Sequence, residues 1–492
     1  MKLKVNNKLL LAIKVVFFLT LLYFPLFIHL EKLPMRIWDE ARLAVNACEM
    51  NLNHNYIVTY FDGKPDMWNT KPPLMIWIQT LMIKIFGVRE LAIRLPSAVA
   101  ALFTALLLMA FSLKYVKSYW FGFISSFILI TSFGYVHHHG TRTGDYDSLL
   151  TLLTTTYCLS YFMFLESNKI KYLHLFFIAA TLAVLTKSIQ GTLFLPSLAI
   201  YTFAIQGKFK KLIVNKWLYI NSVLFVLIIG GYYLLREKYN PGYIQAVTEN
   251  ELGGRFLKSQ TATQTDFFYY YHNLINERFK SWYLLIPISI IAALTLKNKI
   301  YKRIVIFTGL NILSYWLIIS NAQTKLEWYD LPLYPFLALL SSITIYCIFE
   351  FLRSNSIIKN KIAIQVLPLI FLSIVFFLPY REIIYKTYTP SENEKDYYSM
   401  SYFVRGMIKD PAPFHHYNIS FDNPDKAHLM FYIYMMRDKG KHIEIKDCRY
   451  LNPGDEIIAI QSHEKEFIEK FYNYELLETF GQVKAYKILN HL

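Results

Sequence analysis

Charged residues are scarce in this chain, and their scarcity excludes a soluble enzyme. Asp, Glu, Lys and Arg make up 17% of its 492 residues, whereas a soluble domain keeps about a quarter of its residues charged. Cysteine is scarce as well, with 4 residues that show neither a C-x-x-C pair nor the spacing of metal ligands. The sequence therefore predicts neither a disulfide scaffold nor a thiol site.

Apolar residues are abundant, at 54% of the chain, and they gather in long runs. A transmembrane helix needs about 20 mostly apolar residues to cross roughly 30 Å of hydrocarbon. We therefore predict a mainly α fold, a polytopic helical membrane protein with about 11 transmembrane helices, the pattern allowing about 11 to 13. The predicted spans cover residues 9–30, 91–113, 118–136, 147–166, 171–187, 190–206, 216–235, 281–296, 303–320, 331–352 and 361–380.

Basic residues between the spans indicate the direction of the chain. Lys and Arg number 51 against 35 acids, a net charge of +16, and cytoplasmic loops of membrane proteins collect such residues. If the amino terminus is cytoplasmic, the inner loops are all short and basic, so a topology signal explains much of the charge. No nucleic-acid partner is then needed. These loops begin at Lys114, Glu166, Gly207, Lys297 and Arg353.

Segments on the predicted outer side differ in character. Residues 72–86 form an apolar run too short to span, so we expect a helix that lies along the interface. After the last span the charge rises, and short alternating runs predict strands beside helices. We therefore predict a transmembrane domain at 1–380 and a small extracytoplasmic α/β domain at 381–492. The strands are expected at 417–421, 442–445 and 456–460, and the helices at 427–437 and 463–472.

Polar and ionisable residues also gather on the predicted outer loops. Such residues are costly at membrane depth and usually face a cavity or a partner. A cation can hold a phosphate, and a carboxylate can accept a proton from an acceptor hydroxyl or amine. A lipid-phosphate sugar donor needs both, because its phosphate leaves with negative charge. The gathered residues include Asp39, Glu40, Arg42, Lys71, Arg142, Asp145, Asp147, Lys187, Lys325 and Tyr329.

Five motifs in these loops resemble one known family, in the same order along residues 39–335. They match the polyprenyl-phosphate-dependent glycosyltransferases of the GT-C fold, and the chain is similar to the branch of the lipid A aminoarabinose transferase and the protein O-mannosyltransferases. The motifs are Asp39-Glu40-Ala41-Arg42, Lys71-Pro72-Pro73-Leu74, Arg142-Thr143-Gly144-Asp145-Tyr146-Asp147, Leu185-Thr186-Lys187, and Lys325-Leu326-Glu327-Trp328-Tyr329.

The resemblance implies an inverting glycosyltransferase that takes a hexosyl or pentosyl group from a polyprenyl-phosphate donor such as undecaprenyl phosphate. The acceptor would be lipid A, another glycan or a protein, and the process a lipid A modification in lipopolysaccharide biosynthesis. The place would be the bacterial cytoplasmic (inner) membrane, with the active site and the tail outside. The implied roles are catalytic for Asp39, Glu40 and Asp147, donor-phosphate binding for Lys71, Arg42, Arg142 and Lys187, and substrate binding for Asp145, Lys325 and Tyr329.

One departure from the family concerns a metal. The aminoarabinose branch commonly has Glu before the Lys-Pro-Pro motif, where it can contribute to a metal site, but this chain has Thr70. No metal ligand and no cofactor is therefore assigned, although a divalent metal stays open. The run His137 to His139 does not replace it, because adjacent residues of a helix or strand point in different directions.

Simpler interpretations compete with these roles. Asp39 could be an N-cap of the helix that follows, and Lys71 an interfacial lysine that extends its ammonium to water. Arg142 and Asp147 could pair only to close a turn between two spans. These alternatives stay open at the level of sequence.

Two other function classes compete with the enzyme. A lipid-linked sugar flippase or transporter should have polar residues at mid-membrane on interrupted, symmetry-related helices, whereas here they lie in outer loops and no internal repeat is visible. A membrane-embedded assembly protein would use its outer domain to hold a partner. Transfer of a sugar to an acceptor separates the enzyme from both.

Overall fold

Two compact units make up the chain, and each is built from discontinuous segments. The first comprises 1–28, 65–75 and 95–387, and the second 29–64, 76–94 and 388–492. The predicted domains follow chain order instead, and their division at residue 380 stays a prediction. The computed structural model describes residues 7–137, 139–204, 207–257, 266–296, 298–354, 361–390, 392–409, 417–422 and 425–492.

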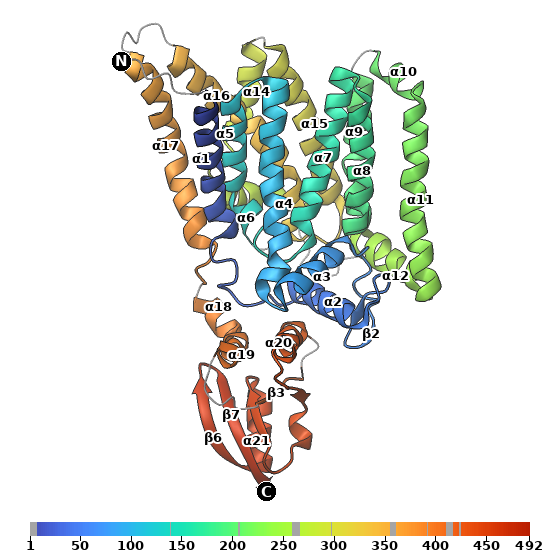
Figure 1. The fold of residues 1–492 in the computed structure, drawn as a ribbon, viewed down its shortest axis with the longest axis vertical. Helices are drawn as coiled ribbons and strands as arrows, with labels where there is room; N and C mark the ends of the chain where they lie inside the picture. The colour runs from blue at the N-terminus through green and yellow to red at the C-terminus, as the bar shows by residue number, and fades with distance from the viewer. Residues whose placement is uncertain are drawn as a thin grey trace. The chain divides into compact units, whose positions relative to one another are not determined.

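The first unit is a bundle of helices (Figure 1). Its long helices are α1 (Asn7–Phe27), α4 (Glu90–Phe111, whose first turn belongs to the second unit), α7 (Tyr146–Ser167), α8 (Ile170–Lys187), α11 (Lys216–Tyr239), α15 (Lys299–Asn321), α16 (Tyr334–Ser354) and α17 (Lys361–Lys386). Its shorter helices are α5 (Tyr119–Ile130), α6 (Phe133–Val136), α9 (Leu195–Ala204), α10 (Lys208–Ile213), α12 (Tyr243–Val247), α13 (Tyr269–Asn273) and α14 (Leu285–Thr295).

The predicted polytopic helical fold is confirmed. Among the described residues, 7 helices are long and apolar enough to cross a membrane, and each of the eleven predicted spans overlaps a helix. In the central α7, 89% of the most apolar window is buried, compared with 6% in α11. Because α11 is apolar on sides that no other helix covers, those sides suit contact with lipid. Lys297, in one predicted basic loop, lies outside the described residues.

Helices α7 and α8 form a hairpin that brings two helix ends together. Asn168 ends α7 in the left-handed conformation, with φ of 56°, which Asn tolerates at a helix terminus. The chain then reverses, so that the beginning of α7 and the end of α8 lie at the same end of the bundle. Gly191 follows α8, and a Cβ there would come within 2.5 Å of the Ala183 carbonyl carbon. The close return of the chain over α8 therefore requires glycine at that position.

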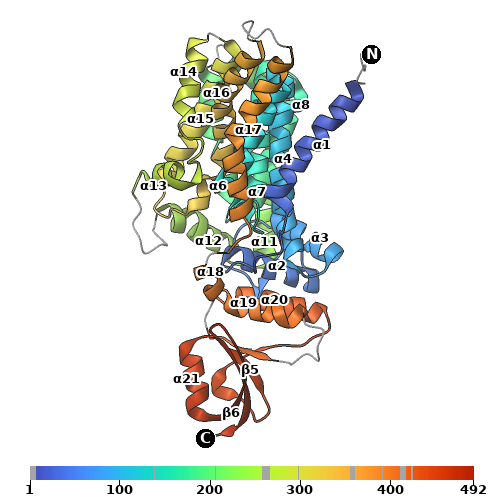
Figure 2. The ribbon, with the colours of Figure 1, turned by 90° about the vertical axis from the view of Figure 1, so that its left-hand side faces the viewer.

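The second unit contains short helices and a five-stranded sheet. Its sheet has the strand order β4-β3-β5-β7-β6, in which β3 runs parallel to β4 and β5 while β7 is antiparallel to β5 and β6. Helix α21 lies against the sheet (Figure 2). The elements are α2 (Asp39–Asn53), α3 (Leu74–Phe86, which starts in the first unit), α18 (Glu392–Tyr397), α19 (Ser399–Lys409), α20 (Ala427–Asp438), α21 (Ser462–Phe471), β3 (Asn418–Ser420), β4 (Ile445–Lys446), β5 (Glu456–Ala459), β6 (Tyr472–Phe480) and β7 (Val483–His491). A two-stranded ribbon, β1 (Tyr60–Phe61) and β2 (Lys64–Pro65), lies between α2 and α3.

The predicted α/β character of the tail is confirmed, but its longest hairpin was missed. Strands β3, β4 and β5 and helices α20 and α21 fall within or overlap the predicted segments. The β6–β7 hairpin was not predicted. Strand β6 is an edge strand whose residues are mostly exposed on both faces, so it carries no apolar alternation.

The buried His428 on α20 predicts a pH-dependent stability of the second unit. It is 5% exposed, and burial lowers its pKa to about 4 from about 6.5 in an unfolded chain. Well above pH 6.5 the imidazole of His428 is neutral in both the folded and the unfolded protein. As the pH falls towards 4, the unfolded state binds a proton first, so stability decreases, by about 2 kcal/mol at pH 5.

Hydrogen–deuterium exchange of α20 in the full-length protein measures this effect. Protection factors of wild-type α20 should fall between pH 7 and pH 5, whereas those of the His428→Phe variant should stay level over that range. His442→Phe, at an exposed histidine, should behave as wild type. Equal pH dependence in all three proteins would contradict the assignment.

Candidate functional site

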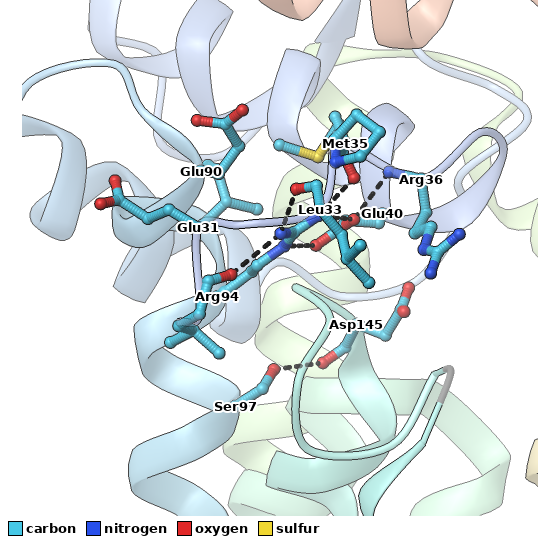
Figure 3. Close-up of polar contacts among 12 residues, drawn as sticks. Glu31, Leu33, Met35, Arg36, Glu40, Glu90, Arg94, Ser97 and Asp145 are labelled. Atoms are coloured by element: carbon cyan, nitrogen blue, oxygen red, sulfur yellow. Dashed lines mark hydrogen bonds and ion pairs between the residues drawn. The ribbon is translucent and has the colours of Figure 1, made fainter. Parts of the chain in front are cut away.

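A buried ion pair between Arg94 and Glu40 organises the loop that precedes α2 (Figure 3). Arg94 is 2% exposed and Glu40 0%. The guanidinium donates to both carboxylate oxygens of Glu40, at 2.7 and 3.0 Å. It also donates to the backbone carbonyls of Leu30, Leu33 and Pro34, at 2.7 to 2.9 Å. These five bonds use every N–H donor of the guanidinium.

This ion pair determines the role of Glu40. Its carboxylate also accepts the Arg36 backbone N–H at 2.8 Å, so the side chain is occupied in holding the loop. These contacts give Glu40 a structural role, and its predicted catalytic role stays a prediction. Its neighbour Asp39 is the first residue of α2 and is partly exposed. Trp38, which precedes it, has φ of 73°, a conformation that is uncommon for a bulky residue and marks a constrained turn.

Arg42, one turn into α2, lies over the ring of Phe61, with 4.1 Å from its guanidinium carbon to the ring centroid. The second unit thus contains Asp39, Glu40 and Arg42, and the first unit contains the other predicted site residues.

In the first unit, Asp147 and Lys187 form a buried pair at the shared end of the α7–α8 hairpin. The Lys187 ammonium donates to both carboxylate oxygens, at 2.6 and 2.7 Å, and both side chains are 3% exposed. A carboxylate at the beginning of α7 and a cation at the end of α8 also complement the two helix dipoles. The ammonium lies 5.2 Å from the ring centroid of Tyr329. Three predicted site residues are therefore together.

Asp145, the residue before α7, lies beside His139. The His139 Nδ1 and an Asp145 carboxylate oxygen are 3.2 Å apart, and the imidazole stacks on Trp328 with ring centroids 3.6 Å apart. The Asp145 backbone carbonyl accepts the Ser97 hydroxyl at 3.2 Å, as Figure 3 shows, while the Ser148 hydroxyl donates to the Ser97 carbonyl at 2.7 Å. This reciprocal pair fixes the start of α7 against α4.

Imidazole and carboxylate groups can ligate a divalent metal. Within the first unit, His139 and Asp145 offer two such ligand groups. A divalent metal stays open. His138 lies outside the described residues.

Arg142 contacts the end of α1. Its guanidinium donates to the carbonyls of Pro25 and Ile28, at 3.0 and 2.6 Å. These groups belong to the last turn of α1 and the turn after it, where carbonyls lack helical partners. Arg142 thus caps α1 in the structure, and its predicted phosphate contact stays a prediction.

Lys71 lies in the loop before α3, buried with 7% exposure. Its ammonium is 3.6 Å from a carboxylate oxygen of Glu251 and 5.5 Å from the ring centroid of Tyr146. The Thr70 hydroxyl donates to the same Glu251 oxygen at 3.4 Å. Glu251 comes from a π-helical segment, Thr248–Leu257. Sequence reasoning missed Glu251 because 181 residues separate it from Thr70.

Lys325 precedes a 3-10 helix, Glu327–Leu333, which contains Tyr329 and leads into α16. The Lys325 ammonium donates to the Ala322 carbonyl at 2.8 Å, and burial lowers its pKa. The nearby Asp330 pairs with Arg278 through two bonds of 2.9 and 3.1 Å, and Tyr334 donates to the same carboxylate at 3.2 Å. Arg278 was not among the predicted site residues.

Comparisons with known proteins agree with this fold. The profile of the family described as dolichyl-phosphate-mannose-protein mannosyltransferase matches residues 70–231. An uncharacterized protein of Aquifex aeolicus (strain VF5) is 27% identical over 331 residues, 66% of this chain but 61% of that protein. The crystal structure of ArnT from Cupriavidus metallidurans bound to undecaprenyl phosphate has a TM-score of 0.70 at 14% identity, over 98% of each chain.

A second solved structure is more distant. Archaeal oligosaccharyltransferase AglB from Archaeoglobus fulgidus, in complex with an inhibitory peptide and a dolichol-phosphate, has a TM-score of 0.51 at 10% identity, over 95% of this chain and 74% of that one. The fold thus defines a class, the multi-pass membrane proteins with the GT-C fold. Within that class the chain is similar to ArnT and to the mannosyltransferase family, as the sequence motifs predict.

Removing Glu40 should destabilise the second unit strongly. Glu40→Gln leaves the Arg94 guanidinium buried without its counter-charge, at a cost of about 3 to 5 kcal/mol. Asp39→Asn, at the adjacent and partly exposed carboxylate, should change stability by at most about 0.5 kcal/mol. The measurement is thermal unfolding of purified full-length variants, together with hydrogen exchange of α2.

A double variant tests whether the pair acts as a unit. Glu40→Gln combined with Arg94→Gln should lose less stability than the sum of the two single changes, since contacting residues are coupled. Strict additivity would mean that the two side chains do not stabilise one another.

Proposed function

We propose that this protein is an integral membrane glycosyltransferase. It would move a sugar from a polyprenyl-phosphate donor to a lipid A, glycan or protein acceptor on the outer face of the bacterial cytoplasmic membrane. The observation that carries the proposal is the fold shared over nearly the whole chain with ArnT, which was solved with undecaprenyl phosphate. AglB, with a dolichol-phosphate, has a related fold. Both ligands are polyprenyl phosphates, which supports a lipid donor of that class here.

Lys71 is the cation that we assign first to the donor phosphate. Its ammonium lies 3.6 Å from a carboxylate oxygen of Glu251, and in the sequence it opens the Lys-Pro-Pro motif that the resemblance links to the donor phosphate. A lysine ammonium in this position can bind a phosphate oxygen through a charge-assisted hydrogen bond. Arg42, Arg142 and Lys187 are proposed as further contacts of the donor, and Asp145, Lys325 and Tyr329 as contacts of the substrates.

Asp39 is proposed as the general base. Its carboxylate would take the proton from the acceptor hydroxyl or amine as that atom attacks the anomeric carbon. The bond between this carbon and the phosphate oxygen would break on the opposite side, so that the polyprenyl phosphate leaves and the configuration inverts. Asp147, paired with Lys187, would support the site without taking the proton.

Sugar transfer in membranes tests the enzyme against its alternatives. Membranes containing the wild type, incubated with radiolabelled polyprenyl-phosphate sugars, should pass label to an acceptor. Asp39→Asn should reduce this transfer by at least a hundredfold, within the range of general base catalysis, in a protein that stays folded. Near-normal turnover by purified Asp39→Asn would refute the role of Asp39. Movement of label across the membrane without transfer would support a flippase instead.

Donor binding tests Lys71 separately. Lys71→Ala should weaken the binding of a polyprenyl-phosphate sugar about tenfold to a hundredfold, the value of one hydrogen bond to a charged group. Lys64→Ala, at an exposed lysine of strand β2, is the control and should bind as wild type. A lipid-phosphate binding assay on the purified proteins measures both, and equal affinities of the two variants would exclude a phosphate contact by Lys71.

A further inference from the structure

A carboxylate lies where an anionic ligand of Lys71 would be expected. We call Lys71, Thr70 and Glu251 the Lys71 cluster. One oxygen of Glu251 receives both the Thr70 hydroxyl, at 3.4 Å, and the Lys71 ammonium, at 3.6 Å. The side chains of Lys71 and Glu251 are 8% and 3% exposed. The charge of Lys71 is thus balanced inside the protein by a residue from a remote part of the chain.

The backbone around the cluster is held by the segment that leads into Glu251. The Tyr243 hydroxyl donates to the Thr70 carbonyl at 2.7 Å, and the Asn250 amide to the Met67 carbonyl at 3.2 Å. Arg236 donates to the Asp66 carbonyl at 3.3 Å. Residues 236–251 and the loop at 66–71 therefore form one connected assembly, which fixes the position of Glu251 relative to Lys71.

Glu251 and a phosphate are like charges that meet the same cation. A phosphate bound at Lys71 must share the ammonium with Glu251 or displace it, and like charges at short range repel. The repulsion depends on the charge of the ligand. A sugar donor is a phosphodiester with one negative charge, whereas the polyprenyl phosphate product is a monoester with about −1.5 to −2 at neutral pH.

We propose that Glu251 is a positioning residue that holds the Lys71 ammonium in place between turnovers. It also weakens the binding of the phosphate product to that ammonium. This inference rests on the proposed function, since it takes Lys71 as the donor-phosphate contact. Glu251 orients Lys71 before the donor arrives. After transfer, the extra negative charge of the monoester is repelled more strongly than the donor was, and the product leaves.

The test is the affinity of the purified full-length protein for a polyprenyl monophosphate. Glu251→Gln keeps an oxygen that can accept from Thr70 and Lys71 but removes the charge. It should bind the monophosphate about tenfold more tightly than wild type, the effect of one nearby charge, with a smaller gain for the phosphodiester donor. Its kcat should fall while its KM for the donor does not rise. Glu249→Gln removes an exposed charge from the same segment and should leave both affinities unchanged.

A merely structural role predicts the opposite result. If Glu251→Gln binds the monophosphate no more tightly than wild type, the inference is overturned. Glu251→Asp keeps the charge but draws it back by one methylene, and it should bind between wild type and the Gln variant. This second variant decides the question if Glu251→Gln does not fold, because weaker binding by Glu251→Asp than by wild type would also overturn the inference.

The same assay separates this inference from the proposed function. If the wild type binds no lipid phosphate, or if the Lys71→Ala variant binds it as tightly as the wild type does, the assignment of Lys71 to the donor fails. The inference about Glu251 then fails with it. If Lys71→Ala loses binding while Glu251→Gln does not tighten it, only the role of Glu251 fails.

Discussion

A charge buried in an apolar helical protein must be neutralised, and this constraint shapes both units of the structure. Taking a carboxylate or ammonium out of water costs several kcal/mol. The attraction of an oppositely charged partner offsets this cost only when the two groups are well aligned for hydrogen bonding. The pairs Asp147–Lys187, Glu40–Arg94 and Asp330–Arg278 each have two short hydrogen bonds. They join helix ends and loops that are distant in sequence. Buried charges therefore hold distant segments of the chain together within each unit.

The same constraint separates structural cations from a ligand-binding one. Arg94 donates all its guanidinium N–H groups to Glu40 and three backbone carbonyls, and Arg142 caps α1. Lys71 instead faces Glu251 through a longer contact. An anion that reaches Lys71 would share its ammonium with Glu251. The proposed division of roles thus follows from differences in geometry between residues of the same charge.

The fold could be predicted from sequence further than the site could. Each apolar run that was predicted to span the membrane overlaps a helix of the structure. The hydrocarbon layer sets both the length and the composition of such helices, so the sequence reveals them. The exposed strand β6 was not predicted, because it lacks an alternation of apolar and polar residues. For the site, loop motifs named Asp147, Lys187 and Tyr329 separately, but only the α7–α8 hairpin shows that they meet. The contacts of Glu251 with Lys71 and of Glu40 with Arg94 are tertiary contacts, for which one sequence carries no signal.

The central claim is that the protein breaks the bond between a sugar and a polyprenyl phosphate. The most direct measurement is an NMR analysis of the products formed by the purified protein from a polyprenyl-phosphate sugar and a membrane extract. The account predicts one free polyprenyl monophosphate for each sugar joined to an acceptor, and an anomeric configuration opposite to that of the donor. Recovery of the donor intact, whether or not it has crossed a vesicle membrane, would contradict the account.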